Sequence, residues 1–321
     1  MFTETQLEEA QRIVYAAMPP TPQYMWPLLA AETGCETWVK HENHTPTGAF
    51  KVRGGLVHMA LRKARGETGG VISATRGNHG QSIPFAARRV GISVTIVVPF
   101  GNSPEKNAAM RALGADLIEA GDDFDSARET AVQLAQERGL SFIASFGPEL
   151  VLGVSTYAHE LLQGAGELDA VYVPIGMGSG ICGVIAARDM LGLKTEVIGV
   201  SAERAATYAL SFAAGQPVAT NSAATFADGL AVRIPNADAL ATIAKGAARI
   251  VTVNEDEIAA AMRLYYRCCH TIAEGAGAAS LAALLKEKDK MKGRRAGIVL
   301  SGGNIDMDKF ATVLSGATPT P

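Results

Sequence analysis

Short apolar runs rich in Val and Ile alternate with amphipathic helical stretches along almost the whole of this 321-residue chain. Brief β-branched runs of this kind are typical of parallel strands that are covered on both faces. Strands are expected at residues 37–40, 70–74, 93–99, 115–119, 142–145, 170–175, 196–201, 250–253 and 296–301. Helices are expected at residues 5–18, 50–65, 79–90, 104–113, 124–138, 148–162, 180–191, 204–214, 255–269, 276–287 and 308–314. The alternation predicts an α/β fold with parallel sheets and right-handed crossovers.

Length and charge narrow the class of protein further. The length suggests roughly two domains of about 150 residues each. The net charge of −3 shows no basic footprint for nucleic acid, and no uncharged apolar stretch reaches the roughly 18 residues that a membrane helix needs. The first ten residues carry three glutamates and no Lys or Arg, so no secretory signal is expected. We therefore expect a soluble, cytoplasmic protein that binds neither nucleic acid nor membranes.

The four cysteines show no metal-binding spacing and are expected to be buried free thiols. They are Cys35, Cys182, Cys268 and Cys269. The adjacent pair lies in a helical pattern, so its side chains should point about 100° apart.

A glycine-rich segment at residues 174–183 follows a Val-rich strand and opens a helix. Gly178, Gly180 and Gly183 satisfy G-x-G-x-x-G, and Glu203 lies 20 residues beyond the last of them. This is formally a dinucleotide fingerprint. Its physical basis is broader, because glycines let backbone N–H groups approach any phosphate at a helix N-terminus. The segment therefore predicts an anion site, and NAD is only one candidate ligand.

Three further polar segments lie at the ends of strands or the starts of helices. Lys51 is expected in the first turn of a helix, where the helix dipole disfavours a cation unless it is neutralised, for example as an imine. Residues 73–81 place more hydrogen-bonding side chains at a helix N-terminus than one N-cap needs. Residues 298–304 deliver Ser301 from a buried strand to a glycine turn. Each segment alone also has an ordinary structural interpretation, such as a solvated lysine, a capping histidine or a strand exit.

Together, these segments resemble the fold-type-II pyridoxal-phosphate enzymes, specifically the serine/threonine dehydratase and serine racemase group. The family's S-F-K-x-R-G motif reads A-F-K-V-R-G at residues 49–54, and its S-G-N-H-G-Q loop reads R-G-N-H-G-Q at residues 76–81. Its phosphate loop matches residues 176–180, and its S-G-G-N segment matches residues 301–304. Weaker matches occur at residues 227–229 and 274–277. The resemblance extends from about residue 20 to residue 306 in the family's order.

The resemblance implies a two-domain fold like that of the tryptophan synthase β subunit. A small domain at residues 48–145 would be inserted between the two pieces of a large cofactor-binding domain, residues 1–47 and 146–321. The implied cofactor is pyridoxal 5′-phosphate, with Lys51 as its imine partner and as the catalytic base. The implied contacts to the cofactor come from Phe50, Lys51, Asn78, Gly176, Met177, Gly178, Ser179, Gly180, Gly229, Glu274 and Ser301. The implied contacts to the substrate come from Thr75, Arg76, Asn78 and His79.

The implied reaction is the conversion of a 3-hydroxy amino acid to a 2-oxo acid and ammonia, in a homodimeric lyase. Asn78 would bind the 3′-oxygen of the cofactor ring and Ser301 the ring nitrogen. A neutral hydroxyl does not hold that nitrogen protonated, and this favours β-elimination over transamination. Threonine or serine is the default substrate, with 3-phenylserine or 3-hydroxyaspartate as bulkier possibilities.

Two positions depart from the family pattern. Arg76 stands where the racemases have a serine that protonates Cα, and an arginine is a poor proton shuttle. We expect Arg76 to face the substrate side chain, or else to point to solvent or an internal acid. Some relatives bind a divalent cation through a Glu and an Asp six residues apart; Glu203 is present here but Ala209 fills the second position, so no metal site is expected. A C-terminal regulatory domain is not expected either.

Three alternatives to the lyase remain open: an NAD-dependent oxidoreductase, an amino-acid racemase of the same fold, and a non-catalytic amino-acid-binding protein. The oxidoreductase would leave Lys51, Asn78 and Ser301 unexplained. The intact lysine argues against the binding protein.

Overall fold

The structure of the protein is a computed structural model that describes residues 2–321. Its strands are β1 (Gln23–Met25), β2 (Glu36–His41), β3 (Val71–Ala74), β4 (Val94–Val98), β5 (Asp116–Glu119), β6 (Ser141–Phe142), β7 (Ala170–Pro174), β8 (Glu196–Ala202), β9 (Arg249–Val253) and β10 (Arg295–Leu300). Its helices are α1 (Glu4–Tyr15), α2 (Pro27–Thr33), α3 (Lys51–Ala64), α4 (Asn78–Val90), α5 (Pro104–Ala112), α6 (Phe124–Arg138), α7 (Pro148–Gly164), α8 (Ser179–Met190), α9 (Thr207–Ala214), α10 (Ala237–Gly246), α11 (Glu255–Cys269), α12 (Gly275–Lys286), α13 (Lys288–Met291) and α14 (Met307–Leu314). Three short 3₁₀ helices, η1 (Glu42–His44), η2 (Glu203–Ala205) and η3 (Asp228–Leu230), complete the elements.

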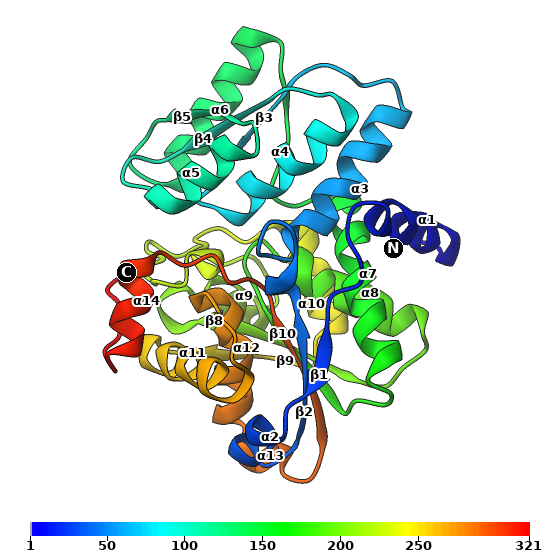
Figure 1. Cartoon of the computed structure of the whole chain (residues 1–321), viewed down its shortest axis with the longest axis vertical. Coiled ribbons are helices and arrows are strands. Elements are labelled where there is room, and N and C mark those ends of the chain that lie inside the picture. Colours follow the sequence, from blue (N-terminus) through cyan, green and yellow to red (C-terminus); the bar gives the residue numbers. More distant parts are fainter. Residues whose placement is uncertain (1) are drawn as a thin grey trace.

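The strands form two separate sheets, which confirms the mixed α/β class (Figure 1). A six-stranded sheet has the order β1-β2-β10-β7-β8-β9, and a four-stranded sheet has the order β5-β4-β3-β6. The smaller sheet, with α4, α5 and α6, forms the upper part of the view in Figure 1, and the larger sheet forms the lower part. Along the chain, the four strands of the smaller sheet (β3 to β6) lie between β2 and β7 of the larger sheet. The domain boundaries at residues 47/48 and 145/146 remain a prediction.

The larger sheet is sandwiched between two hydrophobic cores because successive strand residues point to opposite faces. In β7, Tyr172 packs with α11 and α12 on one face. Its neighbours Val171 and Val173 pack with α7, α8 and α10 on the other face. The strands read as continuous apolar runs because both faces are covered.

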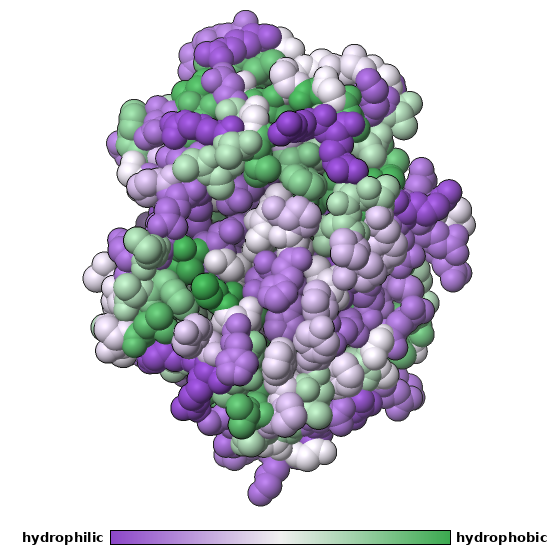
Figure 2. Space-filling model, viewed as in Figure 1, coloured by the Kyte–Doolittle hydropathy of each residue, from purple (hydrophilic) through white to green (hydrophobic). Residues whose placement is uncertain are grey.

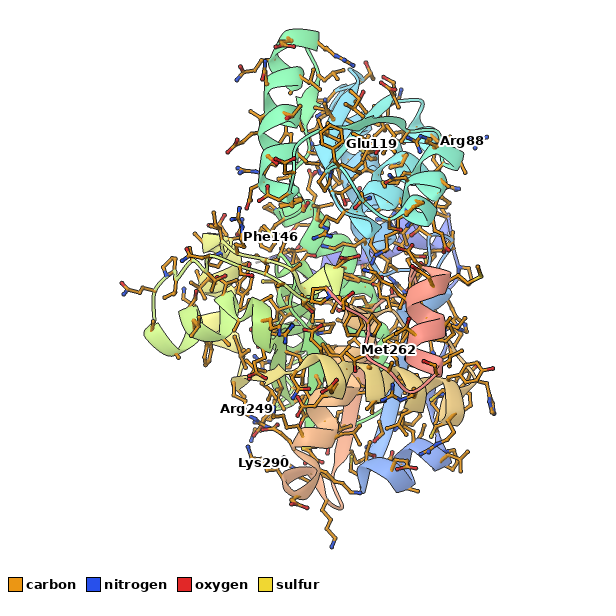
Figure 3. All side chains as sticks on the ribbon, turned by 90° about the vertical axis from the view of Figure 1, so that its left-hand side faces the viewer. Arg88, Glu119, Phe146, Arg249, Met262 and Lys290 are labelled. Atoms are coloured by element: carbon orange, nitrogen blue, oxygen red, sulfur yellow. The ribbon has the colours of Figure 1, made fainter. Side chains whose placement is uncertain are left out.

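The smaller sheet shows the same alternation. Val71 in β3 packs toward α3 and α4. The next residue, Ile72, packs against the alanines of α6. In the view of Figure 3, Glu119 marks the upper part, Met262 the lower part, and Phe146 the region where the two parts meet.

Several element predictions need correction. The sheets are mostly parallel, as predicted, and the missed exception is β1, which pairs antiparallel with β2 at one edge of the larger sheet. This strand has three residues and follows a proline-rich stretch, so it carries no apolar run. The strand expected at 142–145 is only β6, since residues 144 and 145 leave the sheet and line a cavity described below. The helix expected at 204–214 is divided between η2 and α9, and the helix expected at 5–18 ends at Tyr15.

Three helices have no counterpart in the predicted elements, namely α2, α10 and α13. Two of them carry signals that could have been found. Pro27 lies in the first turn of α2, and Gly34 follows its last residue in a left-handed conformation. Asn236 caps α10 by accepting a hydrogen bond from the backbone N–H of Ala239.

The four cysteines are buried free thiols, as predicted. In residues 2–321, no helix combines the length and the apolar character that crossing a membrane requires. On the face shown in Figure 2, hydrophilic residues are widespread, and a group of hydrophobic residues gathers over the region of α11 and α14.

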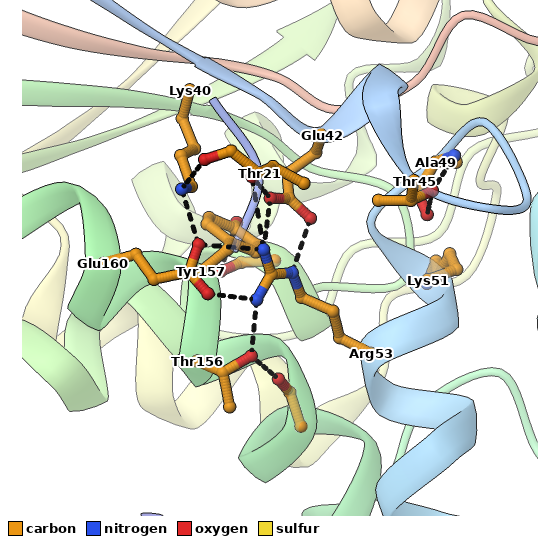
Figure 4. Close-up of polar contacts among 12 residues, drawn as sticks. Thr21, Lys40, Glu42, Thr45, Ala49, Lys51, Arg53, Thr156, Tyr157 and Glu160 are labelled. Atoms are coloured by element: carbon orange, nitrogen blue, oxygen red, sulfur yellow. Dashed lines mark hydrogen bonds and ion pairs between the residues drawn. The ribbon is translucent and has the colours of Figure 1, made fainter. Parts of the chain in front are cut away.

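A buried ion network fixes the helix that begins with Lys51 (Figure 4). The guanidinium of Arg53, which is fully buried, lies 2.8 Å from Glu42 and 2.6 Å from Glu160. Lys40 pairs with the second oxygen of Glu160, at 2.5 Å. Although burial opposes ionisation, Arg53 and Lys40 hold the pKa of Glu160 below its usual value. The first turn of α3 is therefore tied to β2, η1 and α7.

Candidate active site

A cavity of about 120 Å³ lies between the two sheets, and its wall contains every residue that the sequence assigned to the site. The assigned residues lining it are Phe50, Lys51, Thr75, Arg76, Asn78, His79, Gly176, Met177, Gly178, Ser179, Gly180, Gly229, Glu274 and Ser301. They come from the ends of β3, β7 and β10, from the starts of α3, α4, α8 and α12, and from η3. Parallel strands present their carboxyl ends along one edge of a sheet, and ligand sites of α/β folds form there.

Lys51 is the first residue of α3, and its amino group points to the glycine-rich loop. The Nζ atom donates a hydrogen bond to Ser179 Oγ at 3.1 Å and lies 5.2 Å from the centre of the Phe50 ring. Burial alone lowers the pKa of Lys51 to about 8, and no acidic side chain of residues 2–321 offsets this effect. Roughly a tenth of the amine is therefore neutral and nucleophilic at pH 7, far more than for an exposed lysine.

The glycine-rich loop forms a cradle of backbone N–H groups at the start of α8. Gly178 has a φ of 98°, a left-handed conformation that side chains other than glycine rarely adopt. A Cβ atom at Gly176 would approach the carbonyl oxygen of Gly229 to 2.2 Å. The first N–H groups of α8 have no intrahelical acceptor and no side-chain cap. Together with the helix dipole, they form a site for an anion such as a phosphate.

Asn78 is held in place by two partners from distant parts of the chain. Its Nδ2 donates to Glu274 Oε1 at 2.7 Å, and its Oδ1 accepts from Asn304 Nδ2 at 2.8 Å. Asn304 also donates to the carbonyl oxygen of Thr47. Burial raises the pKa of Glu274 to about 7, against the opposing effects of Lys106 and Asn78. Asn304 was part of a recognised motif but was not assigned to the site, and its role is to orient Asn78.

Ser301 follows β10, and only 4% of its surface is exposed. Its carbonyl oxygen accepts a hydrogen bond from the N–H of Phe50, which connects it to the residue before Lys51. Within residues 2–321 its hydroxyl has no hydrogen-bond partner, and the residue lines the cavity. The hydroxyl is thus available to a ligand atom that accepts or donates one hydrogen bond.

The start of α4 presents a second set of free backbone N–H groups in the wall of the cavity that holds the lysine. The hydroxyl of Thr75 accepts hydrogen bonds from the N–H groups of Gly77 and Gly80, so Thr75 shapes the turn. The N–H groups of Asn78 and His79 begin the helix and have no intrahelical acceptor. Burial, Lys51 and His58 lower the pKa of His79 to about 3, so its ring is neutral. A carboxylate would be bound here by backbone N–H groups and the helix dipole rather than by a charged histidine.

Arg76 lines the cavity but already has an acidic partner. Its Nη2 lies 3.5 Å from Asp228 Oδ1, and 42% of its side chain is exposed. Lys106, on α5, shares the same carboxylate at 2.9 Å. Sequence reasoning overlooked Lys106 and Asp228 as cavity residues; Lys106 lies in an ordinary amphipathic helix and carries no local signal. Glu203, the residue of the dinucleotide interpretation, is exposed in η2 and does not line the cavity.

These features fit pyridoxal 5′-phosphate. The cavity offers an amine with a lowered pKa for an aldehyde, a glycine cradle for a phosphate, and a free hydroxyl in the wall. A Cβ atom at Gly176 or Gly178 would clash with the carbonyl oxygen of Gly229 or with Ala239, so the loop needs glycine at both positions. Lys51 is within 3.1 Å of a side chain of that same loop. A dinucleotide would not need the lysine.

Comparisons with known proteins agree with this fit. A family model described as pyridoxal-phosphate dependent enzyme matches residues 14–302. The L-threonine ammonia-lyase of Thermotoga maritima is 34% identical over 316 residues, covering 98% of this chain and 79% of that protein. The L-threo-3-hydroxyaspartate ammonia-lyase of a Pseudomonas species is 32% identical over 297 residues, covering 92% and 93%. The structure of maize serine racemase superposes with a TM-score of 0.91 at 25% identity, covering 98% of this chain and 97% of that one.

Proposed function

The chain belongs to the family of pyridoxal-phosphate dependent enzymes, and on that basis we propose that it is an ammonia-lyase of 3-hydroxy amino acids. The reaction removes the proton from Cα and the hydroxyl from Cβ as water. The enamine that is released takes up water again and yields a 2-oxo acid and ammonia, so the atoms balance. The similar proteins named as ammonia-lyases support this assignment.

One observation carries the proposal. The amine of Lys51 lies 3.1 Å from Ser179 in the glycine cradle, in a cavity whose wall also holds Asn78 and Ser301. These residues come from four segments spread over some 250 positions of the chain. Their convergence on a lysine whose pKa is lowered by burial supports a site built for a phosphorylated aldehyde.

The residues that would hold the cofactor are those that the family resemblance implies, and their convergence on one cavity supports them. Lys51 would hold its aldehyde carbon, the loop of residues 176–180 its phosphate, and Ser301 its ring nitrogen. When bound, pyridoxal phosphate supplies an electron-withdrawing ring that acidifies the Cα–H bond of an attached amino acid. Asn78, fixed by Glu274 and Asn304, would contact the ring oxygen.

The chain's own groups have separate tasks in the reaction. The start of α4 binds the substrate carboxylate through the N–H groups of Asn78 and His79. The neutral amine of Lys51 accepts the Cα proton, and burial keeps this amine available near neutral pH. Ser179 accepts a hydrogen bond from the same amine and so sets its direction.

The racemase alternative is less well supported. Racemisation needs a second group that gives a proton to the opposite face of Cα. Position 76 holds an arginine, which does not release a proton at physiological pH, and its guanidinium faces Asp228. The similarity to the maize racemase is also at lower identity than that to the lyases.

The test combines a spectrum with product analysis. The purified protein, loaded with pyridoxal phosphate, should show a visible absorption band that borohydride removes. Incubation with threonine or serine should then release ammonia and a 2-oxo acid in equal amounts. Inversion of the amino acid without ammonia would favour the racemase, and binding of a nicotinamide cofactor without the visible band would favour the oxidoreductase.

Location, assembly and domain boundaries are further parts of the proposal. We propose a cytoplasmic homodimer with its small domain at residues 48–145. An apolar surface supports the dimer, because α11 and α14 pack together and leave Tyr266, Met307 and Leu314 exposed. Sedimentation of the wild type and of Met307→Asp would test this, with a dimer expected for the first and a larger monomer fraction for the second.

A further inference from the structure

We propose that the preferred substrate carries an aromatic ring on Cβ, as in 3-phenylserine, and that a chamber next to the lysine cavity binds this ring. The inference rests on the proposed function and specifies its substrate. The chamber has a volume of about 460 Å³, against about 120 Å³ for the lysine cavity. The two spaces adjoin, because both are lined by Arg76, Phe124, Ser145, Met177, Ala231 and Val232.

The chamber wall is mainly apolar and aromatic. Phe124, Phe142 and Phe146 come from the start of α6, from β6 and from the segment after it. Residues 231–235, from the larger part of the chain, form the opposite wall. Figure 3 shows Phe146 where the upper and lower parts of the molecule meet. Aromatic rings prefer to pack edge-to-face or offset against one another, so this wall favours an aryl group.

The substrate's other groups direct its side chain to the chamber. The carboxylate is assigned to the start of α4, and the amine must lie at Lys51. Two substituents of Cα remain: the hydrogen must face Lys51, which removes it, and the side chain takes the other position. Met177 of the cradle and Phe124 connect the lysine cavity to the chamber on this route. The methyl group of threonine would leave nearly the whole chamber to water.

The positively charged side chains of the chamber are mostly paired with acidic groups, so they provide no clamp for an acidic substrate side chain. Arg233 pairs with Asp125 and lies 3.2 Å from Asp123, and both aspartates line the chamber. Arg76 is paired with Asp228. Arg128 is exposed on α6 and has no acidic partner within residues 2–321. A carboxylate would meet one unpaired cation together with the aspartates, whereas an aryl group needs no charge partner and can stack on a guanidinium.

The first experiment compares kcat/KM for 3-phenylserine, threonine and 3-hydroxyaspartate in the loaded enzyme. We expect 3-phenylserine to exceed threonine by about tenfold or more, the scale of discrimination that an apolar pocket provides. Turnover of threonine with no preference for 3-phenylserine would overturn the inference and leave the proposed function intact. Absence of turnover with every 3-hydroxy amino acid would overturn both.

The second experiment fills the chamber. Ala144 is exposed in the chamber wall and lies outside the lysine cavity, so Ala144→Phe should fold. The ratio of kcat/KM for 3-phenylserine to that for threonine should fall about tenfold in this variant. Ala112→Phe is the matched control, since Ala112 is exposed at the end of α5 and lines neither the chamber nor the lysine cavity; its ratio should equal that of the wild type. An unchanged ratio in Ala144→Phe would overturn the inference.

A binding measurement gives a readout that does not depend on turnover. L-phenylalanine and L-alanine lack the leaving hydroxyl, and calorimetry on the loaded enzyme gives their dissociation constants. L-phenylalanine should bind about tenfold more tightly, and Ala144→Phe should remove this difference. Preferential turnover of 3-hydroxyaspartate, lost in Arg128→Ala, would instead assign the chamber to an acidic side chain and overturn the inference.

Discussion

The ammonium group of Lys106 lies 2.9 Å from a carboxylate oxygen of Asp228, and this ion pair joins the part of the chain that forms the smaller sheet to the part that forms the larger one. Lys106 is on α5, beside β4 and β5, and Asp228 begins η3 beside the glycine cradle. Both side chains are largely buried, at 9% and 18% exposure. Although burial opposes it, Asp228 raises the pKa of Lys106, so the pair is charged.

Asp228→Asn should therefore destabilise the protein. The variant leaves Lys106 buried without its partner, which costs about 3 kcal/mol for a pair of this kind. The free energy of unfolding in urea measures the loss. The double variant Lys106→Met/Asp228→Leu removes both charges and should recover most of it. Equal stability of Asp228→Asn and the wild type would show that the pair is not energetically coupled.

Lys51→Ala should abolish both covalent cofactor binding and turnover. No other lysine that lines the cavity reaches the cradle, since Lys106 is paired with Asp228. Loss of the catalytic base alone lowers turnover by about a hundredfold to ten-thousandfold. Borohydride treatment followed by mass spectrometry should find the cofactor on the peptide containing Lys51 in the wild type and on no peptide in the variant. Ammonia release close to the wild-type rate would remove Lys51 from the mechanism.

Cofactor capture by the cofactor-free protein should depend on pH with a midpoint near 8. Burial lowers the pKa of Lys51 from 10.5 to about 8, and only the neutral amine attacks an aldehyde. The capture rate should thus rise with pH and level off above the midpoint. Stopped-flow absorbance over pH 6 to 10, on a protein whose fold is monitored by circular dichroism, gives the profile. A midpoint near 10.5, the value of an exposed lysine, would show that the amine is in contact with bulk water.

Arg76→Ala should lower kcat/KM for the preferred substrate by roughly tenfold, about 1.4 kcal/mol. The residue lines both the lysine cavity and the neighbouring chamber, so it can contact the substrate side chain. The loss for serine should be much smaller. Comparison across serine, threonine, 3-phenylserine and 3-hydroxyaspartate separates two roles. Equal losses for all four would assign Arg76 to the shared carboxylate or to its ion pair with Asp228.

Residues that carry local chemistry were predictable from the sequence. Gly178 has a left-handed backbone, which calls for a glycine at that position. Lys51 lies in the first turn of a helix, where a lysine is unusual. Both features can be recognised in the local sequence. Apolar runs such as β7 predicted the parallel sheets, because a strand that is buried on both faces needs apolar residues at every position. The predicted helix starts at residues 124 and 255 match those of α6 and α11, and both helices begin at a local side-chain cap.

Contacts between the part of the chain that forms the smaller sheet and the part that forms the larger sheet could not be predicted from the local sequence. Lys106 and Asp228 are 122 positions apart, and although Asp228 lies in the weaker match at residues 227–229, nothing near Lys106 in the sequence indicates that the two pair. The pairing of Arg53 with Glu160 is set by the packing of α3 on α7, which the local pattern does not contain. The chamber forms because residues 144–146 leave the sheet after β6 and line it. The apolar run in this segment predicted a strand that continues to residue 145.

The short antiparallel strand β1 also bears on how this protein behaves at high concentration. An unpaired edge of a sheet can extend by pairing with the edge of another molecule, which is a common start of aggregation. Strand β1 covers the open side of β2 with only three residues, and Pro22 and Pro27 lie close to its two ends. Proline offers no N–H group for further pairing. This edge of the six-stranded sheet is thus short and interrupted, which disfavours pairing with a second chain there.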